Sequence, residues 1–332
     1  MKKKKYLIGI ETTAHTFGVG IIDENFNIVS NLKDVFTTER GGIVPSEAAE
    51  HHKKVSYNLF QKSLKETKIS EEEIIAIAFS DSPGLAPCLS VGTEFTKKLA
   101  KKLKIPIVGV NHCIAHLEIG EICGSKDPVL LYVSGANTQI IAYEGKKYRV
   151  FGETLDLGVG NFIDCFAREV GIGFPGGPKI EELAKKGKKY IELPYSIKGM
   201  DISFSGILTK LIHLKNKGEK IEDLSFSMQE TIFSMLVEAS ERAIAHLGKK
   251  ELVLGGGVAC NSRLQEMCRI MCEERGCKLF IPEKKFLVDN GAMIAYLGLK
   301  MFKRGIFYKP SEIDKVDFNP KKRTDMVDVL WK

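Results

Sequence analysis

Two histidines four residues apart form the pattern in this chain that points most directly to chemistry. His112 and His116 lie in the segment VNHCIAH, after an apolar run that predicts a strand and at the start of a predicted helix. On a helix, this spacing places both imidazoles on one face about one turn apart, close enough to share a metal ion. Capping and packing roles are the alternative. A zinc peptidase would need a glutamate directly after the first histidine, where this chain has Cys113.

Two residues elsewhere in the chain are candidates to complete a metal site. Tyr132 lies in the apolar segment VLLYV, which predicts a strand. Asp289 lies in FLVDNGAMIA, which predicts a strand followed by a helix start. The cysteines offer a competing pattern, because Cys268, Cys272 and Cys277 are close in sequence. The chain contains no CxxC pair, however, so structural thiols are favoured over a zinc site.

Three glycine-containing turns could bind a nucleotide. The segment SGANTQ at 134–139 combines a glycine with hydroxyl and amide groups that suit a phosphate, and a plain hairpin turn is the alternative. The turn at 158–164 leads into a helix, where Asp164 either caps the helix or accepts a hydrogen bond from a ribose hydroxyl. Three glycines at 255–257 directly follow a strand and favour close approach of an adenine or ribose over a simple turn.

The elements that must position these residues recur along the chain. Strands are predicted at 6–11, 18–23, 27–31, 74–80 and 105–110, with helices at 47–70 and 92–102. A second strand–turn–strand–turn–strand pattern begins at Val129. It precedes helices at 161–169, 179–186 and 225–247, a strand at 251–254 and a helix from 261. Two strands around a small-residue turn therefore occur twice, about 120 residues apart.

This duplicated pattern is typical of the actin-like ATPase and sugar-kinase fold. We expect an α/β protein with two lobes, each built on a mixed sheet flanked by helices, and a nucleotide cleft between them. The expected lobes are residues 1–126 and 127–304, with the region 305–332 packing back on the first lobe. A mixed α/β protein with two unrelated sheets is the alternative. No low-complexity linker separates the halves, which favours lobes packed around a shared cleft.

Composition limits the class of protein. The 332 residues are 44% hydrophobic and 27% charged, which is ordinary for a globular protein and excludes a fibrous one. No apolar run approaches the ~20 residues that span a bilayer, so no membrane association is expected. The apolar run at 6–10 is also too short for a signal peptide. We expect a cytoplasmic protein whose eight cysteines are reduced thiols.

Taken together, these segments resemble the tRNA N6-adenosine threonylcarbamoyltransferase family. They are most similar to the archaeal and eukaryotic type that is the catalytic subunit of the KEOPS complex. The resemblance extends from about Tyr6 to Trp331. It rests on GIETTAHTFGVGI, NHCIAHLEIG, YVSGANTQ, GETLDLGVGNFIDCFAREVG, GGPKIEELA, GMDISFSG, GGGVACNSRL and VDNGAMIA. A small departure is Ala115, where the family often has glycine.

The resemblance implies an activity and a set of site residues. The family transfers threonylcarbamoyl from threonylcarbamoyl-AMP to the N6 amine of the adenosine next to the anticodon, in tRNAs that read ANN codons. The implied metal ligands are His112, His116, Tyr132 and Asp289. The positions that the family pattern places at the nucleotide or adenylate site are Tyr132, Val133, Ser134, Gly135, Ala136, Asp164, Gly177, Glu181 and Asn261. Further candidates for substrate contact are His15 and His52, which could instead be surface histidines, and Gly256 and Gly257.

The expected cofactors follow from this chemistry. A phenolate with two imidazoles and a carboxylate favours iron, with zinc as the alternative, over magnesium. The expected nucleotide is ATP or threonylcarbamoyl-AMP, with or without Mg²⁺. Because an acyl adenylate is already activated, no covalent nucleophile is expected. Two alternatives remain open: a sugar or carboxylic-acid kinase of the same fold, which needs a catalytic acid near the first hairpin, and a non-catalytic ATP-binding regulator.

Charge indicates how tRNA would be held. The formal net charge is +7, and four of the 49 lysines and arginines lie within the first five residues. Binding a tRNA stem needs several phosphate contacts, and this excess is small for one subunit. We therefore expect the chain to bind tRNA together with partner subunits. The resemblance implies that these are KEOPS-type proteins, including a small atypical protein kinase or ATPase and a small dimerising subunit.

Overall fold

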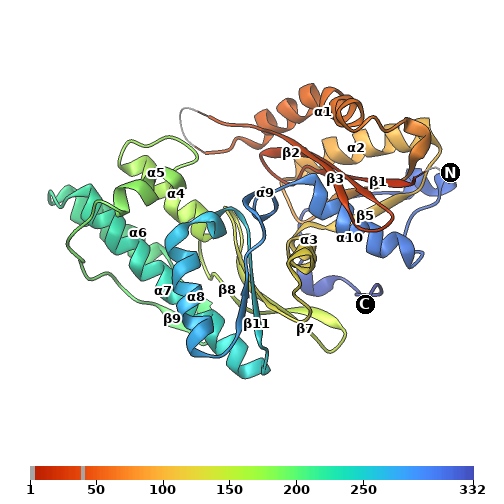
Figure 1. Ribbon diagram of the computed structural model, residues 1–332. Coiled ribbons are helices and arrows are strands. Elements are labelled where there is room, and N and C mark those ends of the chain that lie inside the picture. Colours follow the sequence, from red (N-terminus) through yellow and green to blue (C-terminus); the bar gives the residue numbers. More distant parts are fainter. Residues whose placement is uncertain (1–3, 39–41) are drawn as a thin grey trace.

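Two five-stranded sheets form the framework of the protein, one in each of two lobes (Figure 1). The computed structural model describes residues 4–38 and 42–332. The strands of the first sheet are β1 (Tyr6–Glu11), β2 (Thr16–Asp23), β3 (Ile28–Val35), β4 (Ile74–Ser82) and β5 (Ile107–Asn111). Those of the second sheet are β6 (Val129–Val133), β7 (Thr138–Glu144), β8 (Lys147–Glu153), β11 (Glu251–Gly255) and β12 (Lys278–Phe280).

The two sheets share one topology. The strand orders are β3-β2-β1-β4-β5 and β12-β11-β6-β7-β8. Each sheet combines an antiparallel three-stranded meander with two further strands that run parallel to the first strand of the meander. A short hairpin of β9 (Ile197–Lys198) and β10 (Asp201–Ile202) lies beside β8. The predicted duplication is therefore confirmed, because the two sheets have the same strand order and connections.

Helices cover both faces of the first sheet. The helices α1 (Pro45–Thr67) and α2 (Ala86–Leu103) cover one face, and α10 (Gly291–Lys303) covers the other. All six residues of β1 are buried, as expected for a strand between two layers of helices. The helix α2 starts earlier than the predicted helix at 92–102, because Pro87 is tolerated in the first turn, where no intrahelical N–H is needed.

The second sheet is covered by helices on one face, and its other face turns toward the first lobe. The covering helices are α4 (Val159–Glu169), α5 (Gly177–Ala184), α6 (Ser205–Asn216), α7 (Ile221–Leu247) and α8 (Ser262–Glu274). Residues of β6 alternate between two cores: Leu131 and Val133 pack among these helices, whereas Leu130 and Tyr132 face the opposite side. This period of two follows from the pleat of a strand.

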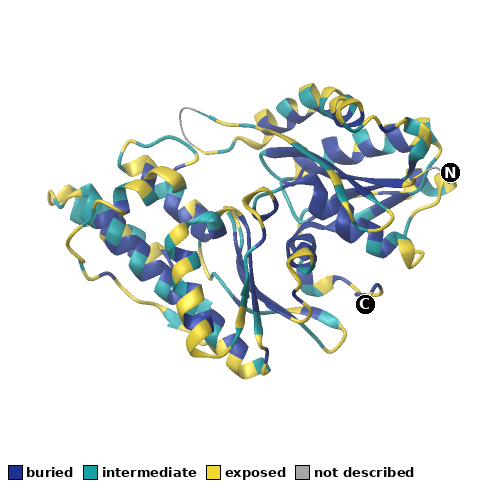
Figure 2. Cartoon of the chain, viewed as in Figure 1, coloured by how far each residue is buried: buried dark blue, intermediate teal, exposed yellow. Residues whose placement is uncertain are grey.

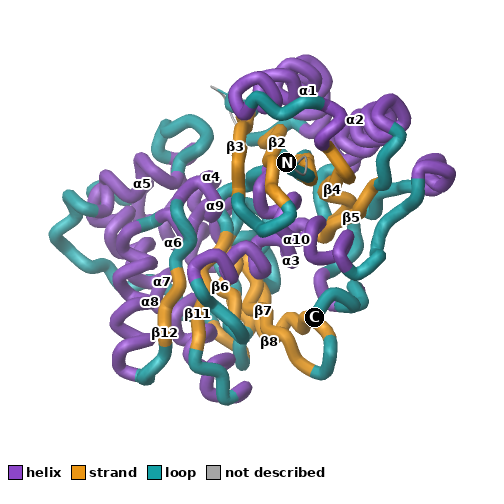
Figure 3. The backbone as a smooth tube through the Cα atoms, turned by 45° about the vertical axis from the view of Figure 1, so that its right-hand side comes forward, coloured by secondary structure: helices purple, strands orange, loops and turns teal. Residues whose placement is uncertain are grey.

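A central hydrophobic core joins the two lobes. It contains residues of both sheets together with α10 and the short helix α3 (His112–Glu118), which lie between the sheets in Figure 3. Burial is concentrated in the strands and on the inward helix faces, as Figure 2 shows. The lobes therefore share a packed interior on the inner side of the second sheet.

The C-terminal segment 305–332 packs on the first lobe and extends to the second. Tyr308 pairs with Ile107 of β5 through backbone hydrogen bonds. Further along, the Arg323 guanidinium donates to Glu153 of β8 at 3.0 Å. Near the end, the Trp331 indole N–H donates to the buried Glu118 carboxylate at 2.9 Å. The segment thus packs on the first lobe, and its contact with Glu153 adds a connection to the second.

Two expectations differ from the structure. The expected boundary at residue 304 assigns 291–303 to the second lobe, but α10 packs against β1, β2 and β4 of the first sheet. The strand expected before Asp289 is absent: residues 284–287 form the short helix α9, because the apolar run there packs as a single helical turn. No helix among the described residues is long and apolar enough to cross a membrane.

We predict that Gly20→Ala strongly destabilises the protein. A Cβ atom at Gly20 would lie 2.2 Å from the backbone nitrogen of Ala292, so α10 would have to move off the sheet. Urea unfolding should show a loss of about 3 kcal/mol, at the upper end of overpacking costs. Gly206→Ala is the matched control, because a Cβ there meets no atom within 4 Å. Equal free energies of unfolding for both variants would contradict the predicted contact.

Candidate metal centre and interlobe pocket

The short helix α3 presents the histidine pair. It begins directly after β5, and the Asn111 side chain caps it by accepting a hydrogen bond from the Ile114 N–H at 3.2 Å. The cap fixes the direction in which the first turn leaves the strand. The rings of His112 and His116 lie 4.7 Å apart, centroid to centroid, and both residues are buried. The i, i+4 spacing thus produces the shared face expected from the sequence.

Asp289 reaches both histidines from the start of α10. Its Oδ1 atom lies 3.4 Å from the Nε2 atom of His112 and 3.4 Å from the Nε2 atom of His116. The next residue, Asn290, caps α10 by accepting a hydrogen bond from the Met293 N–H at 3.0 Å. Asp289 is therefore held at the point where the chain enters the helix that packs on β1 and β2.

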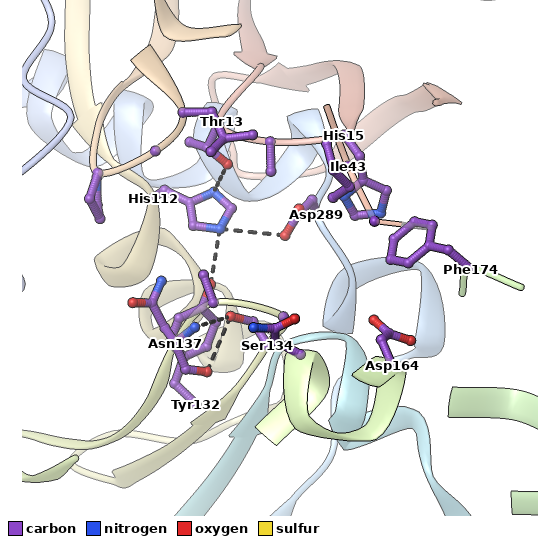
Figure 4. Close-up of a pocket in the computed structure, with 18 of the residues that line it drawn as sticks. Thr13, His15, Ile43, His112, Tyr132, Ser134, Asn137, Asp164, Phe174 and Asp289 are labelled. Carbon is purple, nitrogen blue, oxygen red and sulfur yellow. Dashed lines mark hydrogen bonds and ion pairs between the residues drawn. The ribbon is translucent and has the colours of Figure 1, made fainter. Parts of the chain in front are cut away.

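Tyr132 completes the group from the second sheet. Its hydroxyl lies 3.1 Å from His112 Nε2 (Figure 4), and its ring centroid lies 5.0 Å from that of His116. The structure thus brings together the four residues that the sequence singled out as metal ligands. His112, His116 and Asp289 each offer a ligand atom within 4.8 Å of the others.

The spacing of these atoms fits a small cation. Metal–ligand bonds of about 2.0–2.1 Å in a tetrahedral site separate neighbouring ligand atoms by about 3.3–3.4 Å. The Nε2–Oδ1 separations of 3.4 Å and the Nε2–hydroxyl separation of 3.1 Å lie near that value. Two imidazoles, a carboxylate and a phenol are a donor set for a transition metal. The residues present therefore fit a transition-metal ion.

Electrostatics in the group favour positive charge at its centre. Burial opposes protonation of His112, but the charges of Glu11, Tyr132 and Asp289 raise its pKa well above the usual value. Burial alone would raise the pKa of Asp289, yet charge and hydrogen bonding from His112 and His116 hold it well below the usual value. Burial raises the pKa of the Tyr132 phenol and lowers that of His116. A bound cation would supply the positive charge in place of a proton.

The group opens onto a cavity of about 580 Å³ between the lobes. Thr13 and His15 line it from the first lobe, and Asn137, Asp164 and Phe174 line it from the second (Figure 4). Its volume suits a small-molecule ligand such as a nucleotide derivative. Because His112, Tyr132 and Asp289 also line the cavity, a ligand there would contact the candidate metal site directly.

The predicted phosphate turn between β6 and β7 lies in this cavity. Ser134, Gly135 and Ala136 line it, and Ser134 Oγ accepts a hydrogen bond from the Asn137 N–H at 3.0 Å. The start of α4 supports the turn from behind, because Gly160 N–H donates to the Ser134 carbonyl at 3.0 Å. Val133 does not line the cavity, since its side chain is fully buried in the core of the second lobe.

Asp164 lines the cavity, whereas three other predicted nucleotide-site residues lie outside its lining. Asp164 Oδ1 accepts a hydrogen bond from the Gly176 N–H at 2.7 Å, and burial raises its pKa. Glu181 accepts a hydrogen bond from the Ser262 N–H at 3.1 Å, and Asn261 caps α8. Gly177 begins α5. Glu181 and Asn261 are brought close together outside the cavity lining, because Glu181 contacts Ser262, the residue after Asn261.

Packing within the protein explains part of the glycine run at 255–257. Gly256 has a φ of +91°, and a Cβ there would lie 2.3 Å from the Val133 carbonyl oxygen. The close approach at Gly256 is therefore to the protein's own β6 strand rather than to a ligand. Gly257 is exposed, and a Cβ there would meet no atom within 4 Å. Of the two, only Gly257 leaves room for a ligand.

The two histidines considered for substrate contact differ in position. His15 lines the cavity, and its ring lies 5.7 Å from that of Phe174 across the cleft. His52 lies on α1 and is fully buried. Its Nε2 lies 3.0 Å from the Ala14 carbonyl oxygen, so it donates a hydrogen bond to the loop that carries His15. His52 is thus neither a surface residue nor a cavity residue, and it supports the cavity wall.

One residue of the site, Glu11, was not among those expected from the sequence. Glu11 is fully buried at the end of β1, and its carboxylate lies 2.9 Å from His112 Nδ1. Thr13 lies beside it, and Phe174 faces His15. The available signal for Glu11 was an acidic residue that ends a continuous apolar strand, next to a turn rich in hydroxyl groups.

We predict that His52 makes stability depend on pH. Burial, together with the neighbouring His51, lowers the pKa of His52 from 6.5 to about 4. Between these values the unfolded chain binds the proton more readily, so the free energy of unfolding should fall as pH drops from 6.5 to 4, by roughly 3 kcal/mol. His52→Gln keeps a donor to Ala14 and should lack this part of the decline. Parallel pH profiles of unfolding free energy for the two proteins would contradict the assignment.

Comparison with known proteins identifies the family. Residues 26–296 match the family model described as TsaD, tRNA N6-adenosine threonylcarbamoyltransferase. The proteins of that name from Thermococcus kodakarensis and Archaeoglobus fulgidus are 56% and 49% identical, each over 98% of this chain and 99% of the relative. A protein from Methanosarcina mazei named probable bifunctional tRNA threonylcarbamoyladenosine biosynthesis protein is 50% identical, and the match covers 99% of this chain and 60% of that protein.

Solved structures agree on the fold. HypF from T. kodakarensis superposes with a TM-score of 0.65 at 13% identity, covering 94% of this chain and 49% of HypF. An activator of 2-hydroxyisocaproyl-CoA dehydratase from Clostridium difficile gives 0.56 at 12% identity, covering 90% and 96%. The predicted actin-like ATPase fold is confirmed. Because its sequence matches over nearly its whole length, this chain belongs to the tRNA N6-adenosine threonylcarbamoyltransferase family.

Proposed function

We propose that this chain transfers the threonylcarbamoyl group from threonylcarbamoyl-AMP to the N6 amine of the adenosine next to the anticodon, in tRNAs that read ANN codons. Relatives that match nearly the whole chain carry the name of this transferase. The observation that carries the proposal is the buried group of two imidazoles, a carboxylate and a phenol that opens onto the interlobe cavity.

The proposed metal ligands are His112, His116, Tyr132 and Asp289. Their donor atoms favour an iron or zinc ion over magnesium, and we propose Fe²⁺ with Zn²⁺ as the alternative. When bound, such an ion polarises a carbonyl or phosphate oxygen as a Lewis acid. The protein supplies burial and fixed positions for the ligands: His112 and His116 lie on α3, Tyr132 lies on β6, and Asp289 precedes the cap of α10, and these three elements pack in the central core.

The chain's own residues would bind and orient the two substrates. The reaction joins the adenosine nitrogen to the carbamoyl carbon and breaks the bond from that carbon to the AMP phosphate oxygen, with loss of one amine proton. Ser134 and Asn137 offer polar groups for the donor, and Asp164 offers a carboxylate for a hydroxyl. Gly177, Glu181 and Asn261 are proposed to extend the nucleotide site beyond the cavity, for ATP or the adenylate with or without Mg²⁺. Holding both reactants in one cleft supplies the orientation that the reaction needs.

No covalent intermediate on the protein is needed. Among the described residues, the cysteine that adjoins the candidate ligands is Cys113, which is buried in the central core. Burial raises the pKa of its thiol, so it is a poor nucleophile. The acyl adenylate brings its own leaving group, which makes a nucleophilic residue unnecessary.

The alternative kinase function is not favoured by the contacts of Glu11. A kinase of this fold would need an accessible catalytic acid near the first hairpin. Glu11 is the acid at that position, but it is fully buried and hydrogen-bonded to Thr13 and His112. It therefore supports the histidine pair rather than facing a substrate.

We propose tRNA as the acceptor and KEOPS-type partners as the proteins that help to hold it. These partners are a small atypical protein kinase or ATPase and a small dimerising subunit. The net charge of +7 is small for a protein that binds a tRNA stem alone. The M. mazei relative, of which this chain matches 60%, is named as a bifunctional protein, so in that relative a second activity accompanies the transferase region.

We predict that His112→Ala and Asp289→Ala each lose bound metal and lower the rate of tRNA modification more than about 100-fold. Removing a direct ligand should cost more than the roughly 10–100-fold loss typical of outer-shell partners. Elemental analysis measures the metal, and nucleoside mass spectrometry measures the modification. His213→Ala serves as the control, because His213 is exposed on α6 and is absent from the cavity lining. Full metal content and full activity in either ligand variant would refute the proposed centre.

We predict that this chain alone, supplied with threonylcarbamoyl-AMP and tRNA, modifies tRNA poorly, and that partner subunits restore turnover. The partners should also tighten tRNA binding and steepen its dependence on salt, because they add phosphate contacts. Filter binding at several salt concentrations measures both effects. Full turnover by the isolated chain would show that partners are not required.

A further inference from the structure

The two ring nitrogens of His112 face different environments. Nε2 points toward Tyr132 and Asp289, at 3.1 and 3.4 Å. Nδ1 points toward the first lobe, where Thr13 Oγ1 lies at 3.3 Å (Figure 4) and Glu11 Oε2 at 2.9 Å. A neutral imidazole carries its proton on one nitrogen and can bind a metal through the other. The contacts at Nδ1 therefore determine whether Nε2 is available.

The hydrogen bonds around Glu11 make both neighbours of Nδ1 acceptors. Glu11 Oε1 accepts hydrogen bonds from the Thr13 N–H at 2.7 Å and from the Thr13 hydroxyl at 2.6 Å. That hydroxyl has a single proton, which it uses for Glu11, so toward His112 it can only accept. An ionised carboxylate can also only accept. When His112 is neutral and binds a metal through Nε2, its single proton must consequently lie on Nδ1.

Glu11 is held where it cannot easily move away. It is the last residue of β1, it is fully buried, and it pairs with Gly18 of β2. The strand itself is fixed by α10, because a Cβ at Gly9 would lie 2.2 Å from the Gly291 carbonyl oxygen. A carboxylate on such a rigid strand sets a precise direction for the imidazole that it contacts.

The second histidine lacks this kind of support. Over residues 4–38 and 42–332, the buried Nδ1 atom of His116 has no hydrogen-bond partner. His116 is oriented instead by its place on α3 and by the ring of Tyr132. The support is therefore specific to His112, and it comes from a residue 101 positions away in the chain.

We propose that Glu11 is a positioning residue that fixes the tautomer and ring orientation of His112, so that Nε2 is presented as a metal ligand. The proposal rests on the metal centre described above. Outer carboxylates of this kind orient a metal-bound histidine and increase its basicity. Their loss typically costs about 10–100-fold in metal affinity. We expect a change of that size when Glu11 can no longer accept the hydrogen bond.

Glu11→Gln tests this role with almost no change in size. The amide has one oxygen that accepts and one nitrogen that only donates. If the nitrogen faces His112, Nδ1 must lose its proton, and Nε2 becomes the protonated atom. If the nitrogen instead faces Thr13, its NH₂ group meets the N–H and hydroxyl of Thr13, which are also donors. Either orientation disturbs the presentation of Nε2.

The measurement is the affinity of the full chain for Co²⁺, determined by competition with a chromogenic chelator, together with the d–d absorption bands of bound Co²⁺. We expect Glu11→Gln to bind Co²⁺ 10–100-fold more weakly than the wild type and to alter the bands. Glu118→Gln is the matched control. Glu118 is equally buried and lies on α3, the helix that carries His112, but its partners are Tyr148, Trp331 and Lys300. It should keep wild-type affinity.

Two further comparisons make the result decisive. Glu11→Asp keeps the charge but withdraws the carboxylate from Nδ1, so this variant should also bind Co²⁺ weakly. If circular dichroism shows that Glu11→Gln does not fold, Glu11→Asp takes its place in the test. Wild-type affinity in Glu11→Asp would mean that charge alone matters and would overturn the proposal. So would wild-type affinity in Glu11→Gln, or equal losses in Glu11→Gln and Glu118→Gln. A wild-type protein that binds no Co²⁺ would overturn the metal centre itself.

Discussion

The close contact between α10 and the first two strands is the constraint on which the site depends. A Cβ at Gly9 or Gly20 would lie 2.2 Å from the backbone of α10, so the helix packs almost directly on the main chain of β1 and β2. Asp289 directly precedes Asn290, the cap of this helix, and Glu11 ends the strand beneath it. The same contact therefore sets the position of the carboxylate that faces Nε2 of His112 and of the one that faces Nδ1.

The central core makes one site out of two lobes. Tyr132 faces the first lobe because it alternates with Leu131 and Val133, which pack among the helices of the second lobe. Buried glutamates lie near both ends of the helix α3. Glu11 contacts His112 at its start, and Glu118 at its end accepts hydrogen bonds from Tyr148 and Trp331 of other elements. A rigid core of this kind keeps ligand atoms at fixed distances, which a metal site requires.

Much of the fold followed from local patterns. Buried strands, small-residue turns and the repeated order of elements predicted two lobes with one plan, because strand alternation and turn chemistry act over a few residues. Helix limits were less accurate: α2 begins before Gly92 because proline is tolerated in its first turn, and residues 284–287 form a helical turn rather than a strand. The short apolar run before Asp289 fits either structure, and only packing against the core decides between them.

The sequence by itself determined the shared face of His112 and His116, since helical periodicity fixes it, and the motifs that identify the family. Tertiary structure alone decided the rest of the site. It brought Glu11 to His112 across 101 residues and Asp289 to His116 across 173. It also buried the Val133 side chain in the core of the second lobe and placed the Val133 carbonyl against Gly256. The physical reason is the separation along the chain over which each effect acts. Periodicity orients neighbouring residues within one helix or strand, whereas contacts between distant segments exist only after sheets and helices have packed.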